Sequence, residues 1–213
     1  MAIPKKTKWI SLILKILVVV SAAAGILKSA FASRNTFMGG SRVFMYFTIQ
    51  SNVLIAIICL IGAFLLLKEG PVCSGWYVFK LVGTVAITLT GLVFAFILAP
   101  TMGRLAWNLQ NTLTHAVVPI AAVSDFLLVG AYGNIKKRKL LYVSLPPLAY
   151  VIYAGIGYVK GWDFAGGRNY PYFFLNWGST AGAFGFSDRL PFMGCVWWIL
   201  ALMIIIFGSG YGI

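Results

Sequence analysis

The chain has 213 residues, of which 61% are hydrophobic and only 10% charged, and its mean hydropathy is +0.92. This composition predicts an integral membrane protein. The net charge of +13 does not indicate a nucleic-acid partner, because the lysines and arginines stand mainly at the ends of apolar stretches, where they meet lipid headgroups.

Six apolar stretches are long enough for a helix of about 20 residues to cross the hydrocarbon layer. The stretches are continuous rather than alternating, which predicts helices and not the strands of a barrel. Little sequence remains outside them, so we expect one all-α membrane domain over residues 1–213, a compact six-helix bundle with a partly structured outer loop. In chain order the predicted spans are 9–31, 43–67, 77–99, 112–132, 140–159 and 190–210.

The basic residues predict how the chain crosses the membrane. One side would carry the lysine-rich start at residues 5–8, then Lys68 and Lys80, then the basic run 136–139. The other side has fewer basic residues, and cytoplasmic loops carry the excess. We therefore expect a multi-pass protein of the inner (plasma) membrane with both termini in the cytoplasm.

The second span opens with the polar sequence Phe-Thr-Ile-Gln-Ser-Asn at residues 47–52. Helical spacing places Thr48, Ser51 and Asn52 on one face. Such residues often serve only as hydrogen bonds between helices, worth about 0.6 to 2 kcal/mol each. From the predicted end of the span, we expect Thr48 to lie about 7.5 Å below the outer end of its helix.

The fourth span contains His115, the only histidine of the chain, preceded at helical spacing by Asn108 and Asn111. This span also begins on the outer side, so His115 and Thr48 are expected at similar depth. A hydroxyl beside an imidazole can perform acyl transfer, with His as the base that activates the Thr oxygen. Asn52, Asn108 or Asn111 would orient the histidine or stabilise the developing oxyanion, and the sequence does not choose among them.

Asp125 lies on the same helical stripe as His115, two to three turns deeper. At that distance it is not expected to contact the histidine ring. A carboxyl group within a span is costly without partners. We therefore expect Asp125 to face a polar cavity, a hydroxyl, or a lysine such as Lys15 or Lys80.

The last two spans are separated by a long connection, residues 161–189, that is rich in aromatics and glycine. We interpret it as a lid over the outer end of the bundle; an aromatic belt at the lipid headgroups is the alternative. Arg168 is a candidate for contact with a lipid carboxylate, as are Arg42 and Arg104. Ser51, Asp125 and Tyr170 are further candidates for contact with the substrate or its oxyanion. Pro146 and Pro147 are expected to kink the fifth span.

The sequence predicts no cofactor. One histidine and four widely spaced acids do not form a metal site, and the chain lacks a second obvious haem ligand. We find no glycine-rich nucleotide loop. The expected partners are membrane lipids and a lipid or acyl-ester substrate, while the oligomeric state stays open.

Three motifs together resemble the androgen-induced membrane protein family, which includes the androgen-dependent TFPI-regulating protein and small six-span bacterial members. The motifs are Phe-Thr-Ile-Gln-Ser-Asn at 47–52, His115 with Pro119, and Tyr170-Pro171 in the last outer loop. The resemblance implies a multi-pass threonine hydrolase that cleaves fatty acid esters of hydroxy fatty acids. It also implies that Thr48 is the nucleophile and His115 its partner.

Two other functions remain open at this point. The same polar residues would suit a lipid-binding, transport or sensing protein that holds a carboxylate or headgroup without turnover. A proton-coupled transporter using His115 and Asp125 is less favoured, because the chain has few such groups and no internal repeat.

Overall fold

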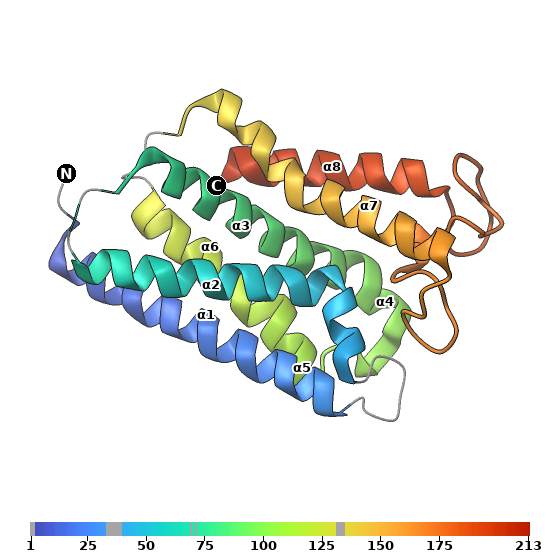
Figure 1. Cartoon of the computed structure of the whole chain (residues 1–213), viewed down its shortest axis with the longest axis horizontal. Helices are drawn as coiled ribbons and strands as arrows, with labels where there is room; N and C mark the ends of the chain where they lie inside the picture. The colour runs from blue at the N-terminus through green and yellow to red at the C-terminus, as the bar shows by residue number, and fades with distance from the viewer. Residues whose placement is uncertain (1–2, 33–39, 69, 71, 131–134) are drawn as a thin grey trace.

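The computed structural model describes residues 3–32, 40–68, 70, 72–130 and 135–213. Six helical stretches of this part are long and apolar enough to cross a membrane, which confirms the predicted all-α membrane bundle. Both termini lie at the same end of the bundle, here named the termini end (Figure 1). The principal helices are α1 (Lys5–Ala32), α2 (Phe47–Lys68), α3 (Ser74–Val93), α6 (Val118–Val129), α7 (Leu145–Lys160) and α8 (Cys195–Gly212).

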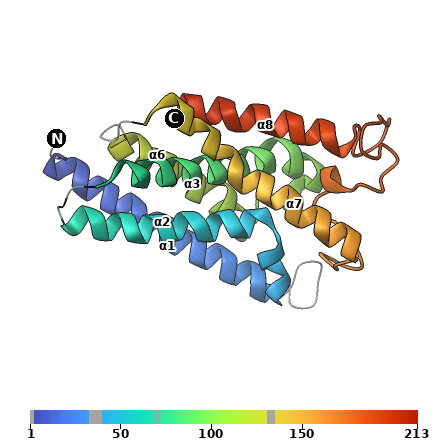
Figure 2. The same ribbon diagram turned by 45° about the horizontal axis from the view of Figure 1, so that its top comes forward.

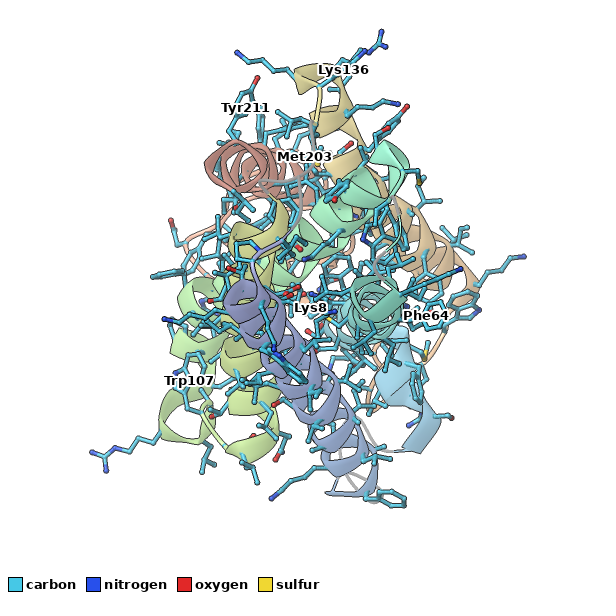
Figure 3. All side chains as sticks on the ribbon, turned by 90° about the vertical axis from the view of Figure 1, so that its left-hand side faces the viewer. Lys8, Phe64, Trp107, Lys136, Met203 and Tyr211 are labelled. Carbon is cyan, nitrogen blue, oxygen red and sulfur yellow. The ribbon has the colours of Figure 1, made fainter. Side chains whose placement is uncertain are left out.

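α3 is the central helix. α1, α2 and α6 pack together, with α2 and α6 against α3, and α7 and α8 also contact α3. Both ribbon views show α8 on the side of α3 away from α1 and α2 (Figures 1 and 2). Large apolar side chains such as Phe64 on α2 and Ile204 on α8 are 64% and 74% exposed, and Phe64 projects away from the bundle in Figure 3. Such an apolar exterior is expected where hydrocarbon surrounds the helices.

The third and fourth spans each contain one π-helical turn. The third continues from α3 through the π-turn Phe94–Leu98, the short helix α4 (Ala99–Met102) and the 3₁₀-turn Gly103–Leu105. The fourth runs through α5 (Leu109–Thr112), the π-turn Leu113–Val117 and α6. In each case a proline, Pro100 or Pro119, stands two residues after the π-turn. A proline leaves the carbonyl four residues before it without a helical partner, which favours a widened turn there.

Several element ends differ from the sequence predictions. α1 begins at Lys5 rather than at residue 9, and the third span extends to Leu105 rather than to residue 99. The predicted end of the fourth span, residue 132, lies outside the described residues. α2 begins at Phe47 rather than at residue 43, because residues Gly40–Met45 form a 3₁₀-helix. Thr48 is therefore the second residue of its helix and lies closer to the helix end than predicted. The prolines of the fifth span do not kink a continuous α-helix; they occupy the first turn of α7 after a 3₁₀-helix, Lys137–Ser144, where a missing N–H donor costs little. α8 begins at Cys195 rather than residue 190.

Residues 161–194, here named the outer segment, fold over the end of the bundle opposite the termini (Figure 1). Phe164, Phe174 and Leu175 of this segment are buried. The segment is tied to the residues before α2: the Tyr46 hydroxyl donates to the Phe164 carbonyl at 3.1 Å, and Arg42 pairs with Asp163 at 2.8 Å. The predicted partly structured loop before the last span is thus present and continues to residue 194.

Candidate functional site

Thr48 and His115 are brought together beneath the outer segment. Thr48 Oγ1 lies 3.3 Å from His115 Nε2, although 67 residues separate them in the chain. Thr48 comes from the first turn of α2 and His115 from the π-turn of the fourth span. His115 is 9% exposed and Thr48 is half-buried. This contact agrees with the expectation that the two residues lie at similar depth.

The hydrogen bonds around His115 determine which ring nitrogen carries the proton. Nδ1 lies 3.0 Å from the Asn111 carbonyl and 2.9 Å from the Thr114 hydroxyl. That hydroxyl donates its own proton to the Gln110 carbonyl at 2.8 Å, so it faces Nδ1 as an acceptor. With two acceptors beside it, Nδ1 is assigned the proton. Nε2 is then free to accept the proton of Thr48.

Close packing holds the histidine ring in this position. The ring of Phe94, from the other π-turn, stacks on it with centroids 3.9 Å apart and planes 24° apart. Gly91 of α3 allows α3 to approach, because a Cβ at Gly91 would lie 3.0 Å from the His115 carbonyl oxygen. Gly25 of α1 similarly accommodates the Thr114 side chain. Three neighbouring elements therefore restrict where His115 can lie.

A small cavity of about 60 Å³ adjoins Thr48. It is almost wholly apolar, with walls from α2, α3, α7 and the outer segment. The outer segment contributes Tyr172, whose hydroxyl oxygen accepts from the Thr48 backbone N–H at 3.4 Å. Burial raises the pKa of Tyr172 above its ordinary value, so its hydroxyl keeps its proton. The hydroxyls of Tyr172 and Thr48 thus line one cavity.

The sequence patterns do not point to Tyr172; they predict Arg168 and Tyr170 as the contact residues of this segment. Arg168 is exposed, and its backbone pairs with Phe164 and Ala165 within the outer segment. Tyr172, which contacts Thr48, stands two positions after Tyr170. The chain turns toward the bundle there, and Phe174 is buried.

Ser51 and Asn52 are next to Thr48 but already have partners. The Ser51 hydroxyl donates to the Thr48 carbonyl at 3.0 Å and lies 2.7 Å from the Thr90 hydroxyl. The Asn52 amide donates to the carbonyls of Thr48 at 2.8 Å and Thr114 at 3.2 Å. Both of its donor directions are used, which leaves Asn52 unsuited to stabilise an oxyanion. It joins α2 to the turn that carries His115.

The other two asparagines have structural roles. Asn108 caps the start of α5, its side-chain oxygen accepting from the Asn111 N–H at 3.0 Å. The Asn111 side chain donates to the Ala106 carbonyl at 2.7 Å. Only the backbone carbonyl of Asn111 contacts His115. Asn111 therefore orients the histidine, which is one of the roles predicted for it, but it does so through its main-chain carbonyl.

Asp125 belongs to a separate buried cluster. Its carboxylate lies 2.5 Å from Lys15 Nζ, 2.7 Å from Lys80 Nζ and 2.5 Å from the Ser11 hydroxyl, which agrees with the partners expected from the sequence. Lys80 is only 3% exposed, so the prediction that it contributes to the basic surface at the termini end is wrong. Within the described ranges, no group of three or more His, Cys, Asp or Glu side chains is placed to hold a metal ion. The cluster is an ionic contact between α1, α3 and α6.

Comparisons with other proteins give no match: no model of a known family, no curated protein and no solved structure is similar to this chain.

Proposed function

We propose that this protein is an intramembrane hydrolase of lipid acyl esters, with Thr48 as nucleophile and His115 as general base and acid. The supporting observation is the 3.3 Å contact between the Thr48 hydroxyl and an unprotonated His115 Nε2 beside an apolar cavity. The motif resemblance to the androgen-induced membrane protein family agrees with this proposal. It also suggests fatty acid esters of hydroxy fatty acids as the substrate class.

In the proposed reaction, Thr48 Oγ1 attacks the ester carbonyl carbon while its proton passes to His115 Nε2. The tetrahedral intermediate collapses when the protonated His115 gives this proton to the departing alcohol oxygen, leaving an acyl group on Thr48. Water then enters where the alcohol stood and loses a proton to Nε2 as it attacks the acyl carbon. Return of that proton to Thr48 releases the fatty acid and restores the enzyme.

The developing oxyanion needs a hydrogen-bond donor. We assign this role to Tyr172, since its hydroxyl lines the cavity beside Thr48 and accepts, rather than gives, a hydrogen bond in its contact with the Thr48 N–H. Rotation about the phenol C–O bond can direct the hydroxyl proton of Tyr172 toward the oxyanion. Asn52, a sequence-based candidate for the same role, already donates to two carbonyls.

We further propose that the termini end faces the cytoplasm and that the site lies toward the outer side of the inner membrane. The lysines at the chain start and the basic run 136–139 lie at the termini end; Figure 3 views this end, with Lys8 and Lys136 labelled. Positive residues favour the cytoplasmic side.

The proposal is tested with purified protein in detergent and a panel of medium- and long-chain acyl esters. Thr48→Val keeps the shape of the side chain but removes the nucleophile, and we expect turnover to fall to background. Thr48→Ser restores a hydroxyl and should retain turnover. His115→Gln should lose about 10²- to 10⁴-fold in kcat. Full activity in Thr48→Val contradicts the mechanism, whereas saturable lipid binding without product in the wild type supports the lipid-binding alternative.

A further inference from the structure

A second, larger cavity opens between α2 and α7. Its volume is about 360 Å³. The lining consists mostly of apolar and aromatic side chains from α2, α3 and α7, together with the polar side chains of Gln50 and Ser51 on α2: Phe47, Leu54, Ala86, Pro146, Ala149, Tyr150 and Tyr153 are the others. Most of its wall is apolar. We name it the α2–α7 groove.

The groove opens on the side of the bundle that faces lipid. Ala149 in its wall is exposed, and the neighbouring α7 residues Leu148 and Ile152 are 38% and 65% exposed. On α2, Ile57 and Ile61 are likewise exposed. Exposed apolar side chains in the middle of membrane-spanning helices contact hydrocarbon chains. A lipid chain therefore has direct lateral access to the groove.

The groove and the cavity at Thr48 are neighbours, because Phe47 and Tyr150 line both. Their rings meet edge to face with centroids 5.3 Å apart. The Tyr150 hydroxyl donates to the Met45 carbonyl at 3.0 Å, which fixes this ring. Phe47 is apolar and immediately precedes Thr48, so a change in its side-chain rotamer joins the two spaces without breaking a side-chain hydrogen bond.

The volumes of the cavity at Thr48 and of the α2–α7 groove indicate which part of a substrate each can hold. Pockets for small-molecule ligands usually measure about 300–1,000 Å³. The cavity at Thr48, about 60 Å³, has room for the reacting ester group but not for a long acyl chain. The groove, about 360 Å³, has the size and the apolar lining that an acyl chain requires.

We propose that the α2–α7 groove binds the acyl chain of the substrate, which enters sideways from the membrane and passes its carbonyl between Phe47 and Tyr150 to Thr48. This inference rests on the proposed hydrolase function and assigns the chain-binding part of the same site. It makes the enzyme selective for long acyl chains.

The test compares kcat/KM for p-nitrophenyl palmitate with kcat/KM for p-nitrophenyl acetate. Ala149→Trp places an indole in the groove and should lower the palmitate-to-acetate ratio tenfold or more, since each methylene kept out of an apolar site weakens binding roughly fourfold. Ile152→Trp adds the same side chain on the lipid-facing surface of α7 and should leave the ratio within about twofold. An unchanged ratio in Ala149→Trp overturns the groove assignment.

A second measurement separates this inference from the proposed function. Wild type and Ala149→Trp are labelled with a palmitate that carries a photoreactive diazirine in mid-chain, and the labelled peptides are identified by mass spectrometry. Labelling of α2 and α7 at the groove in the wild type, reduced in Ala149→Trp, supports the groove even if no ester is turned over. Labelling spread evenly over the lipid-facing helices, and unchanged in the variant, overturns it.

Discussion

The bundle buries polar side chains in two regions that differ in how firmly these side chains are paired. Toward the termini end, the Asp125 carboxylate meets two lysines and a serine at 2.5 to 2.7 Å. At the other end, Thr48 and His115 meet at 3.3 Å next to a cavity. Short mutual contacts across three helices hold a bundle together, whereas a longer contact beside a cavity leaves room for a ligand. The first region therefore suits a structural role, and the second suits the reaction proposed above.

The sharpest way to break this comparison is Asp125→Asn. Two buried lysines then lose the carboxylate that they share, and we expect the free energy of unfolding to fall by about 3–5 kcal/mol. Thermal unfolding in detergent measures the change, with Thr48→Val as the matched control that should stay within about 1 kcal/mol of wild type. If Asp125→Asn unfolds like the wild type while losing turnover, Asp125 belongs to the chemistry and the division between the regions is wrong.

Tyr172→Phe tests the second region from the side of the outer segment. Removing the phenolic hydroxyl removes the proposed oxyanion donor, and kcat should fall about 10²- to 10³-fold with little change in KM. Tyr170→Phe is the control, because it removes the same hydroxyl from a tyrosine of the same segment that does not line the cavity. Equal losses in the two variants would assign both tyrosines to the folding of the segment.

Gly91→Ala tests whether the position of His115 depends on α3. The added methyl would lie 3.0 Å from the His115 carbonyl oxygen and 3.2 Å from Pro119 carbons, so the fourth span must shift by a few tenths of an ångström. We expect kcat/KM to fall about tenfold, since small displacements of catalytic groups are costly. Gly155→Ala is the matched control, as its methyl would meet nothing within 4 Å. Similar activity in both variants would mean that His115 tolerates the shift.

The smallest effect is expected for Lys80→Met. Asp125 keeps Lys15 and Ser11 in this variant. The cluster then contains one lysine and one carboxylate, instead of two lysines and one carboxylate. We expect unfolding to change by less than about 1 kcal/mol, in contrast to Asp125→Asn. A loss as large as that of Asp125→Asn would show that both lysines are needed to hold α1, α3 and α6 together.

The six spans and the Thr48–His115 contact were accessible from sequence because both depend on local rules. Apolar runs predict spans, and two helices that begin on the same side bring residues near their starts to the same level. The helix ends were less accessible. Residues 190–194 are mostly apolar and extend the run that α8 begins, yet their backbone groups bond within the outer segment, as in the contact of the Gly194 N–H with the Gly185 carbonyl at 2.8 Å.

The remaining parts of the site depend on contacts between distant segments. Nothing in the aromatic run from Tyr170 to Trp177 distinguishes Tyr172, whose role follows from how the outer segment folds against α2. The π-turn around His115 did leave a signal, because Pro119 stands four residues after His115 and leaves its carbonyl without a helical partner. The groove is formed by three spans and has no sequence motif.

The ionic cluster also bears on how the chain is inserted during synthesis. Lys15 and Lys80 leave the ribosome in the first and third spans, before the fourth span brings Asp125. A lysine at the centre of a span opposes insertion by about 2.5–3.5 kcal/mol, whereas one near a helix end reaches the interface. Lys15 lies near the middle of the first span, while Lys80 is the seventh residue of the third span. The first span is therefore expected to settle fully in the bilayer only after the fourth span brings the Asp125 carboxylate.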